Sequence, residues 1–372
     1  MPYVELHCHS AFSFLDGASH PVELAAAAAE QGHDALALTD HDGIHGAMEL
    51  AEAARPLGLR SIVGAELTLE DGSHLTLLCE DATGYRNLCR LITRAHEGTR
   101  VGPRQPLSPR VPLTEVERRA EGLVCLSGCA REGALAGRVE RGEHAEAAAL
   151  GRRLLNAFGP ERLRVELQRP FARHDRRRNR DLVALAASLG VPCVATGNVH
   201  THSRERAFLQ DAFVAVRGRT TLDESEAARR GNSAHALASP AAMAERFRDH
   251  PEAVHESGRI ADRLRFDLTR DLGYRYPGSE DPTADRRLAE LCRRLVDERY
   301  AGRATAEEAA QRLETELRVI RSLKLSGFFL LHRDLLELAR EVAVEVRGPD
   351  SARAVLPPGR GRGRACPRSS AT

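Results

Sequence analysis

Short apolar runs alternate with longer amphipathic stretches over the first two hundred residues. Runs of four to six residues predict strands, and stretches with apolar residues at helical spacing predict helices. The predicted strands are 3–7, 35–39, 59–63, 66–70, 74–79, 123–127, 163–167 and 193–196, with a hairpin turn at Asp71-Gly72. The predicted helices are 21–31, 44–55, 85–95, 143–158 and 176–189. Because this alternation is typical of parallel strands covered by helices, we predict an α/β barrel.

The pattern changes after about residue 270. A stretch with Gly, Pro and charged residues, 271–284, predicts a linker. Amphipathic periodicity then predicts helices at 285–300, 306–323 and 328–341. The last residues have no apolar periodicity, and their Arg, Pro, Gly and Ala content is what GC-rich DNA yields when read out of frame. We therefore expect a large domain over 1–270, a helical segment over 285–356, and a disordered or out-of-frame tail over 357–372.

Composition limits the function classes without choosing among them. The 372 residues, 42% of them apolar, suffice for one large and one small domain with a buried core. Lys and Arg number 54 against 53 Asp and Glu, so a surface for nucleic acid would have to be a local patch. Eight cysteines without a CxxC pair, no signal peptide and no membrane-spanning segment predict a reduced, soluble, cytoplasmic protein.

Potential metal ligands follow the ends of the predicted strands. His7 and His9 close the first strand, where residues i and i+2 share a face, so both imidazoles can reach one metal. In a β/α barrel the carboxyl ends of the strands form one rim, which collects such side chains. The candidate ligands are His7, His9, Asp16, His41, Glu66, His96, Cys129, Asn198 and His200.

This donor set predicts a cluster of more than one ion. Nitrogen and oxygen donors together suit Zn²⁺, Mn²⁺ or Fe, whereas oxygen alone would suit Mg²⁺ or Ca²⁺. More than six donors exceed the needs of one tetrahedral ion, but two or three ions bridged by a carboxylate would use them and could promote phosphoryl chemistry. A lone histidine is more often a surface or core residue. Seven others are taken as such: His20, His33, His74, His144, His235, His250 and His255.

These motifs resemble the PHP (polymerase and histidinol phosphatase) domains of bacterial DNA polymerase III alpha subunits. The similarity is greatest to the error-prone C-family branch, the ImuC-type translesion polymerases. It rests on YVELHCHSAFSFLDGAS, ALALTDHDGIHGAMELAEAAR, IVGAELTL, GYRNLCRLITRAH, LSGC and ATGNVHTHSRERAFLQDAFVAVRGRTTLDE. It continues through YRYPGSEDPTADRRLAELCRRLVDERY and KLSGFFLLHRDLLELARE, and covers residues 3–363. The resemblance implies a distorted (β/α)7 TIM-like barrel followed by helices of an incomplete polymerase palm and thumb.

The resemblance also assigns the nine candidate ligands to a metal cluster. Eight of them carry a donor type that the family uses, whereas Asn198 stands where proofreading members have Asp. A neutral amide binds a dication more weakly than a carboxylate and cannot bridge two ions with the same charge compensation. The family implies descent from a 3′–5′ exonuclease, and Asn198 implies that this activity is reduced or lost. Alternatively, the metals persist as a structural staple of the barrel.

The parent enzyme implied by the resemblance is a DNA-directed DNA polymerase of replication and damage-induced translesion repair. Its partners would be DNA, the sliding clamp and translesion accessory proteins. In the family, GRGS opens a palm segment that leads to Mg²⁺-binding aspartates, but here GRGR runs into ACPRSSAT and no Asp-x-Asp follows Phe328. We therefore expect a truncated or frameshifted product that does not polymerise alone, lacks the clamp-binding segment, and has no catalytic residues beyond the metal cluster.

Two other functions remain open at this stage. One is a free-standing PHP phosphoesterase, such as a histidinol phosphatase. The motif GYRNLCRLITRAH and the long C-terminal extension count against it, since the motif separates polymerase-associated PHP domains from free-standing ones. The other is a non-catalytic PHP scaffold, which Asn198 favours over the phosphatase.

Overall fold

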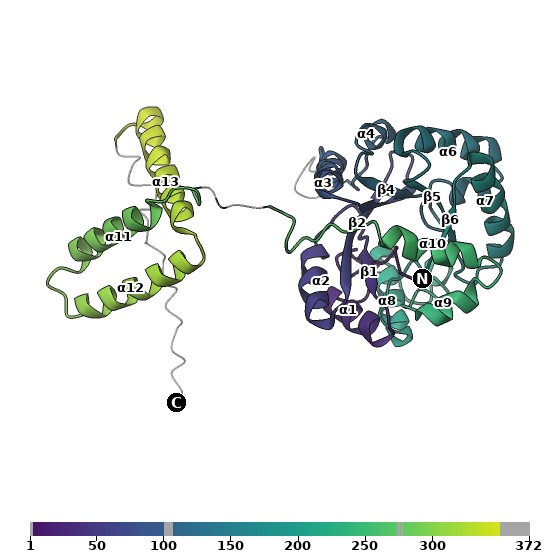
Figure 1. Ribbon diagram of the computed structural model, residues 1–372, viewed down its shortest axis with the longest axis horizontal. Helices are drawn as coiled ribbons and strands as arrows, with labels where there is room; N and C mark the ends of the chain where they lie inside the picture. Colours follow the sequence, from purple (N-terminus) through teal and green to yellow (C-terminus); the bar gives the residue numbers. More distant parts are fainter. Residues whose placement is uncertain (1–2, 100–106, 274–275, 277, 350–372) are drawn as a thin grey trace. The chain divides into compact units, whose positions relative to one another are not determined.

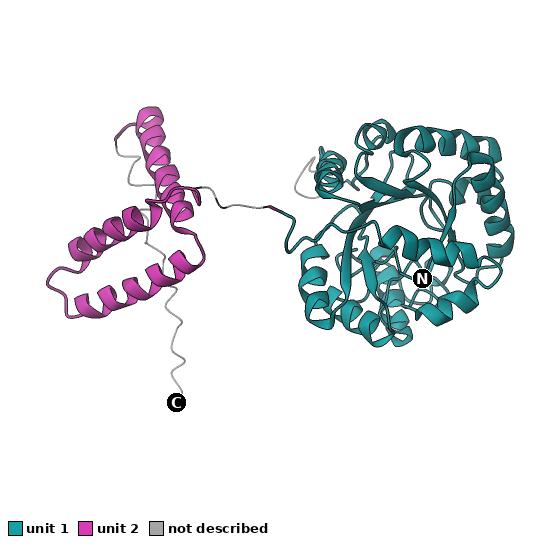
Figure 2. Ribbon diagram, in the orientation of Figure 1, with its two compact units in different colours: residues 1–272 teal, residues 273–372 magenta. Residues whose placement is uncertain are grey.

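The chain forms two compact units, Met1–Leu272 and Gly273–Thr372 (Figure 2). The computed structural model describes residues 3–99, 107–273, 276 and 278–349. The tail expected at 357–372 lies outside the described residues. Within them the cysteines are free of disulfides, and no helix is long and apolar enough to cross a membrane.

A curled six-stranded sheet forms the centre of unit 1, and helices cover its outer face (Figure 1). The order is β1-β2-β3-β4-β5-β6, with β3 antiparallel to both neighbours and the other pairs parallel. This confirms the predicted α/β fold with its hairpin. The strands are β1 (Ala35–Leu38), β2 (Arg60–Thr68), β3 (His74–Cys79), β4 (Leu123–Leu126), β5 (Leu163–Gln168) and β6 (Cys193–Thr196).

The N-terminal segment closes the ring of strands without forming a regular strand itself. Glu5 pairs with Leu36 of β1, while Cys8 pairs with Val199 just after β6, both in parallel. The His9 amide donates to the Val199 carbonyl at 2.7 Å. Each neighbour thus pairs with a different part of the segment, and neither ladder is long enough for a strand. The prediction of a strand at 3–7 is wrong in this respect, although the segment is extended and buried.

Ten α-helices surround the sheet in the described part of unit 1. The sequence predicted α1, α2, α3, α6 and α7 and omitted α4, α5 and α8 to α10. The helices are α1 (Pro21–Glu30), α2 (Ala47–Ala54), α3 (Ala82–His96), α4 (Leu113–Arg118), α5 (Ala136–Glu140), α6 (His144–Phe158), α7 (Asp175–Leu189), α8 (Ala207–Gly218), α9 (Pro240–Arg246) and α10 (Pro251–Ala261). Short 3-10 turns are η1 (Arg55–Leu57), η2 (Arg204–Arg206) and η3 (Glu226–Ala228).

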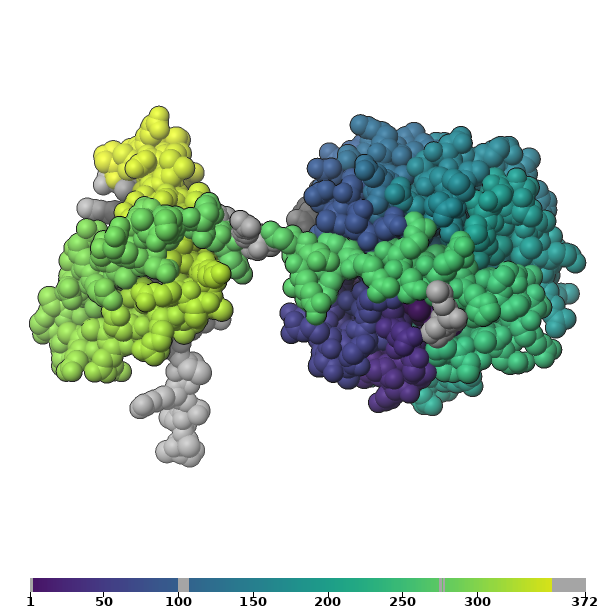
Figure 3. Space-filling view, in the orientation of Figure 1, coloured from purple at the N-terminus to yellow at the C-terminus, as the bar shows by residue number. Residues whose placement is uncertain are grey.

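Helix α10 closes one end of the barrel. Its Ile260 and Ala261 pack with Leu6 and other inward-facing residues of the strands in an apolar interior core. The Val4 amide donates to Ser257 Oγ at 3.0 Å, which ties the helix to the start of the N-terminal segment. The segment that contains α10 crosses this face of unit 1 in the space-filling view (Figure 3). The carboxyl ends of the strands therefore meet at the opposite end, away from α10.

The motif GYRNLCRLITRAH forms most of α3, and its first residue requires close backbone contact. Asp81 caps the helix by accepting hydrogen bonds from the amides of Thr83 and Gly84. A Cβ atom on Gly84 would lie 1.8 Å from the Gly122 carbonyl oxygen. Only glycine fits at this crossing, which seats α3 against the loop before β4.

The described part of unit 2 contains three helices and a small core. They are α11 (Ala284–Tyr300), α12 (Ala306–Ser322) and α13 (Ser326–Arg347), close to the three helices predicted from the sequence. The buried apolar residues are Ala284, Leu288, Ala289, Leu317 and Leu330.

Candidate metal centre

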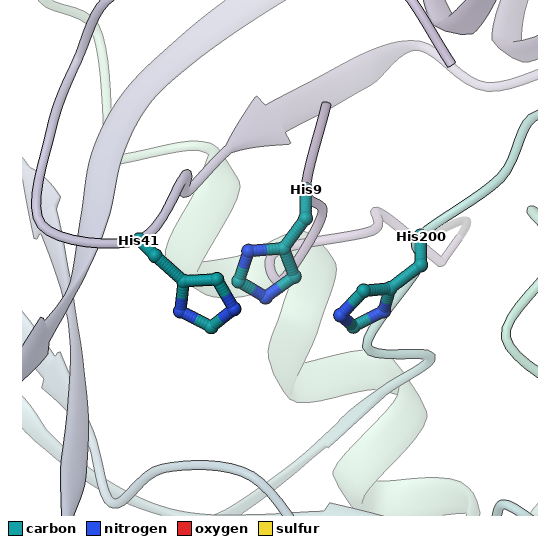
Figure 4. A group of neighbouring side chains, drawn as sticks. All are labelled: His9, His41 and His200. Atoms are coloured by element: carbon teal, nitrogen blue, oxygen red, sulfur yellow. The ribbon is translucent and has the colours of Figure 1, made fainter. Parts of the chain in front are cut away.

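Three histidines from distant parts of the chain meet at the end of the barrel opposite α10. His9 lies in the N-terminal segment, His41 follows β1, and His200 follows β6. The ring centroids of His41 and His200 lie 4.3 and 4.4 Å from that of His9, and Figure 4 shows the three rings side by side. His7 joins them, with 3.1 Å between its Nε2 and the Nε2 of His9. The alternation predicted for His7 and His9 does place both on one face.

The Glu66 carboxylate lies among three imidazoles. Its Oε2 is 2.8 Å from Nε2 of His7, and its Oε1 is 3.0 Å from Nδ1 of His41 and 2.8 Å from Nδ1 of His74. The residue lies near the end of β2 and is almost fully buried. A buried carboxylate must be balanced by nearby cationic groups, and this one is shared by residues from three segments.

Asp16 supplies a second carboxylate on the other side of the histidines. Its Oδ2 lies 3.0 Å from Nε2 of His41 and 3.1 Å from Nε2 of His200. The loop that carries it is held by Asp40, which accepts hydrogen bonds from the Ser10 amide at 2.6 Å and from Ser13 Oγ at 2.7 Å. The aspartate of the TDH motif therefore positions the loop, while its histidine faces the cluster.

The electrostatics of the site come from buried carboxylates close to imidazoles. Burial by itself would lower the pKa of His41, but the Glu66 and Asp16 carboxylates outweigh it and raise that pKa to about 10. Burial is outweighed in the same way at His74, whose pKa rises to about 11, chiefly through Glu66. The pKa of Glu66 is held well below its usual value, since His74 and His41 outweigh the effect of burial. Imidazolium groups thus balance the charge that a divalent cation would otherwise balance.

The residues present fit divalent metal ions. One acceptor, Asn198 Oδ1, is buried without a hydrogen bond among the described residues, and such an atom normally has a partner. Potential ligand atoms lie within 4.8 Å of one another in three groups, which share members as a bridged cluster does. The groups are His7, His9 and Glu66; His9, His41 and His200; and His41, Glu66 and His74.

The chain is similar to known protein families and to known proteins. Residues 5–170 match the family described as PHP domain, and residues 286–356 match the bacterial DNA polymerase III alpha NTPase domain. An error-prone DNA polymerase of Symbiobacterium thermophilum is 40% identical over 365 residues, which are 95% of this chain and 33% of that protein. Residues 5–170 thus resemble PHP domains, and the chain is similar to error-prone DNA polymerases along most of its length.

Another relative and one solved structure complete the comparison. An error-prone DNA polymerase of Cutibacterium acnes is 37% identical over 369 residues, covering 95% of this chain and 32% of the relative. The chain thus spans about a third of the length of the curated relatives it matches. An amidohydrolase structure from Chromobacterium violaceum has a TM-score of 0.39 and 18% identity, and the similarity covers 53% of this chain and 87% of the other.

Two of the nine predicted ligands lie at the border of the PHP cluster. His96, at the end of α3, is exposed, and its Nε2 donates to the Asp42 carbonyl at 2.9 Å. Cys129 is buried within hydrogen-bonding reach of His74, and its Sγ accepts from the Glu132 amide at 3.4 Å. Neither belongs to the three groups above. Metal binding by these two residues remains a prediction.

Asn198 takes part in the PHP site through its backbone. Its φ of +49° lies in the left-handed region, which Asn tolerates better than most residues. Its carbonyl oxygen lies 2.8 Å from Nδ1 of His200 and 2.9 Å from Nδ1 of His235. Because a carbonyl only accepts hydrogen bonds, both histidines carry their proton on Nδ1, and His200 presents Nε2 to the cluster.

Arg230 brings a fixed positive charge to the PHP site that sequence reasoning did not include. Its Nη2 lies 3.1 Å from Asp16 Oδ2 and 2.6 Å from Nε2 of His200. Burial and this guanidinium lower the pKa of His200 to about 4. Arg230 follows His200 by thirty residues in a loop, so no periodicity or strand end in the sequence points to it.

His74 was set aside as ordinary, and this interpretation is wrong. A two-residue turn at Asp71-Gly72 would pair Glu66 with Leu77 and turn His74 to the opposite face of the hairpin. Instead the Leu69 amide donates to the Ser73 carbonyl, which makes the loop one residue longer, and Glu66 pairs with Thr76. His74 then lies diagonally across from Glu66 on the same face.

Glu166 and His235 also belong to the surroundings of the PHP cluster. Glu166 Oε1 lies 2.7 Å from Nδ1 of His7 and so orients that ring. The sequence did contain a signal for Glu166: it is a glutamate inside a buried strand, and a buried carboxylate needs a charged or hydrogen-bonding partner. His235, also set aside from the sequence, gave no comparable signal, since it lies in a loop without regular periodicity.

Proposed function

We propose that this chain is part of an error-prone DNA-directed DNA polymerase that acts in replication and in damage-induced translesion repair synthesis. The order of its two family matches and its similarity to error-prone polymerases along 95% of its length support this. Nucleotidyl transfer with Mg²⁺, and contacts with DNA, a sliding clamp and accessory proteins, are proposed for the whole enzyme.

We propose further that the PHP domain holds two or three divalent ions, Zn²⁺, Mn²⁺ or Fe, and has weak 3′–5′ exonuclease activity. The carrying observation is the Glu66 carboxylate shared among His7, His41 and His74. When bound, such ions would supply a hydroxide nucleophile and stabilise charge on the phosphoryl group. Glu66 would be one of the residues that hold them, and Asn198 would weaken the site because its side chain brings no charge.

A structural role for the metals is the second candidate. The observation in its favour is that Arg230 contacts Asp16 and His200. Its guanidinium takes a place where a second divalent ion would help catalysis. In that case the ions would hold together segments that meet only at this end of the barrel.

Metal analysis and two hydrolysis assays test these proposals. The purified chain is dialysed, its Zn, Mn and Fe contents are measured, and it is tested on a 3′-recessed DNA primer and on p-nitrophenyl phosphate. Bound metal with slow nucleotide release supports the weakened exonuclease, and bound metal with no hydrolysis supports the structural role. Faster turnover of the small phosphomonoester would favour a free-standing phosphatase, and a metal-free protein that takes up none of the three would contradict both proposals.

A further inference from the structure

An arginine-rich groove of about 910 Å³ lies on unit 1 beside the PHP site. Its walls come from the loop after β5, the start of α7, the turn η2 and helix α9. Three segments distant in sequence, 169–176, the turn η2 and 242–249, therefore bring basic side chains to one place, in a chain whose net charge is only +1. The arginines are Arg169, Arg173, Arg176, Arg204, Arg246 and Arg248.

The acidic residues of this groove are already neutralised. Each is paired with an arginine, so none is free to cancel the remaining positive charge. The pairs are Asp175 with Arg178 at 2.7 Å, Glu245 with Arg248 at 3.2 Å, and Asp249 with Arg169.

Three arginines of the groove keep their charge unpaired. Among the described residues, Arg173, Arg176 and Arg204 form no ion pair, and all three are exposed. Arg246 differs from them: it is half-buried, its charge is partly balanced by Glu5, and its guanidinium lies over the face of Phe171. A concave surface with three uncompensated guanidiniums attracts a polyanion, and arginine is well suited to phosphate oxygens.

Phe171 gives the groove an aromatic surface. Its side chain is 69% exposed and its φ of +60° lies in the left-handed region, an unfavourable conformation for a bulky residue. The Arg246 guanidinium lies 5.3 Å from its ring centroid. An exposed ring beside unpaired arginines is the combination on which an unstacked base can lie while its phosphates meet positive charge.

The groove continues to the candidate metal centre. Phe171 and Ala172 also line a second cavity, of about 410 Å³, whose far wall includes Asn198, Arg230 and His235. Arg230 contacts Asp16 and His200 of the cluster. A chain lying along the groove could therefore direct one end past Phe171 towards these residues.

We propose that unit 1 binds single-stranded nucleic acid along this groove. The phosphates lie against Arg173, Arg176 and Arg204, and one base stacks on Phe171. The terminus of the nucleic-acid strand enters the cavity beside Asn198. A duplex offers phosphates but no unstacked base, so the ring selects the single strand. Only the orientation towards the metal centre rests on the proposed exonuclease; binding itself requires no metal.

Fluorescence anisotropy of a labelled twelve-nucleotide DNA single strand tests the proposal in EDTA, at low and high salt. We expect Arg173→Gln with Arg176→Gln to weaken binding about tenfold at low salt and to flatten its salt dependence. We expect Phe171→Ala to weaken it several-fold, of the order seen for loss of one stacked base, with Phe171→Tyr restoring it. The matched control is Arg86→Gln with Arg152→Gln, two exposed arginines on α3 and α6 that form no ion pair with any described residue.

The outcomes separate this proposal from the exonuclease. Absence of binding at low salt, equal binding of duplex and single strand, or equal losses in the control and groove variants would each overturn it. An unchanged affinity in Phe171→Ala would refute the stacking role. Binding in EDTA by a chain that hydrolyses no DNA when loaded with metal would support the groove while contradicting the exonuclease.

Discussion

The two units differ in how completely each fills its own core. Unit 1 encloses an apolar interior between its strands and α10, and it buries charged residues such as Glu66 and Glu166 in contact with histidines. Unit 2 buries few apolar residues, and α13 leaves Leu331, Leu335 and Leu338 exposed at helical spacing. A closed barrel can hold a buried polar cluster in one geometry, because its walls are fixed by packing on both sides. The three described helices of unit 2, with one open apolar face, enclose no comparable interior for such a site.

Loss of the metal ligands gives the largest expected difference between the units. We expect His7→Ala with His9→Ala to abolish metal binding and to remove the stabilisation that metal gives to unit 1. At a metal concentration a thousand times Kd this stabilisation is about 4 kcal/mol. Hydrogen exchange followed by mass spectrometry, with and without metal, reports each unit separately.

The exposed histidines His144 and His255 provide the matched control. Replacing both with Ala should leave the metal-dependent protection of unit 1 intact. Unit 2 should exchange at the same rate in all variants, because its described residues contribute no ligand to the cluster. If excess metal protects the His7 and His9 variant as well as the parent, the cluster is not the origin of the effect.

A matched pair of leucine truncations tests the core comparison directly. Leu6→Ala removes a fully buried side chain from the interior of unit 1 and should cost about 2–5 kcal/mol. Leu335 is 53% exposed on α13, so Leu335→Ala should change stability by less than about 0.5 kcal/mol. Urea denaturation with unit-resolved exchange measures both. Equal losses would mean that α13 buries Leu335 against another surface.

Sequence reasoning reached furthest where burial is uniform. Leu163–Gln168 and Cys193–Thr196 are buried along nearly their whole length. The first alternates apolar and polar residues and the second is mostly apolar, and each of these patterns marked a strand. His7, His9 and His200 could be predicted from the sequence for a related reason. Strand alternation puts neighbouring side chains on one face, and the carboxyl ends of barrel strands lie on one rim. These inferences depend on local pattern and on a general property of the fold.

The residues that were missed depend on geometry that local pattern does not contain. One extra residue in the β2–β3 loop decides whether His74 faces Glu66, and both registers are compatible with the same alternation. Arg230 reaches Asp16 from a loop whose path is set by tertiary packing. The Asn198 carbonyl was not considered because side-chain chemistry, rather than backbone direction, is what a sequence displays.

Unit 2 depends on one close backbone contact, which a single methyl group would disturb. A Cβ atom on Gly327 would lie 2.3 Å from the Gly278 carbonyl oxygen. We expect Gly327→Ala to destabilise unit 2 by about 1–3 kcal/mol, as overpacking does, and to leave unit 1 unchanged. Gly218→Ala in α8 is the control, because its new methyl would meet only the Thr220 side chain, at 3.3 Å. Faster exchange in α11 to α13 alone is the expected result; unchanged exchange there would show that the helices can separate without loss.

The smallest expected effect concerns the one predicted ligand without a charge. Asp accepts the left-handed backbone of position 198 nearly as well as Asn, so Asn198→Asp keeps the carbonyl that orients His200 and His235. It adds a carboxylate where Oδ1 now lacks a hydrogen bond. We expect tighter metal binding and about a tenfold rise in nucleotide release from a DNA primer, equivalent to about 1.4 kcal/mol.

Asn198→Gly separates the side chain of this residue from its backbone. Glycine tolerates a φ of +49° and retains the carbonyl while removing the amide. If the side chain contributes little, this variant keeps the metal content of the parent, and only Asp raises it. Equal metal content and equal rates in all three proteins would show that the charge at position 198 does not limit the site. The deciding question would then be whether a second metal ion can displace the Arg230 guanidinium. If it can, this end of the barrel could hydrolyse DNA; if it cannot, the metal would only hold the segments together.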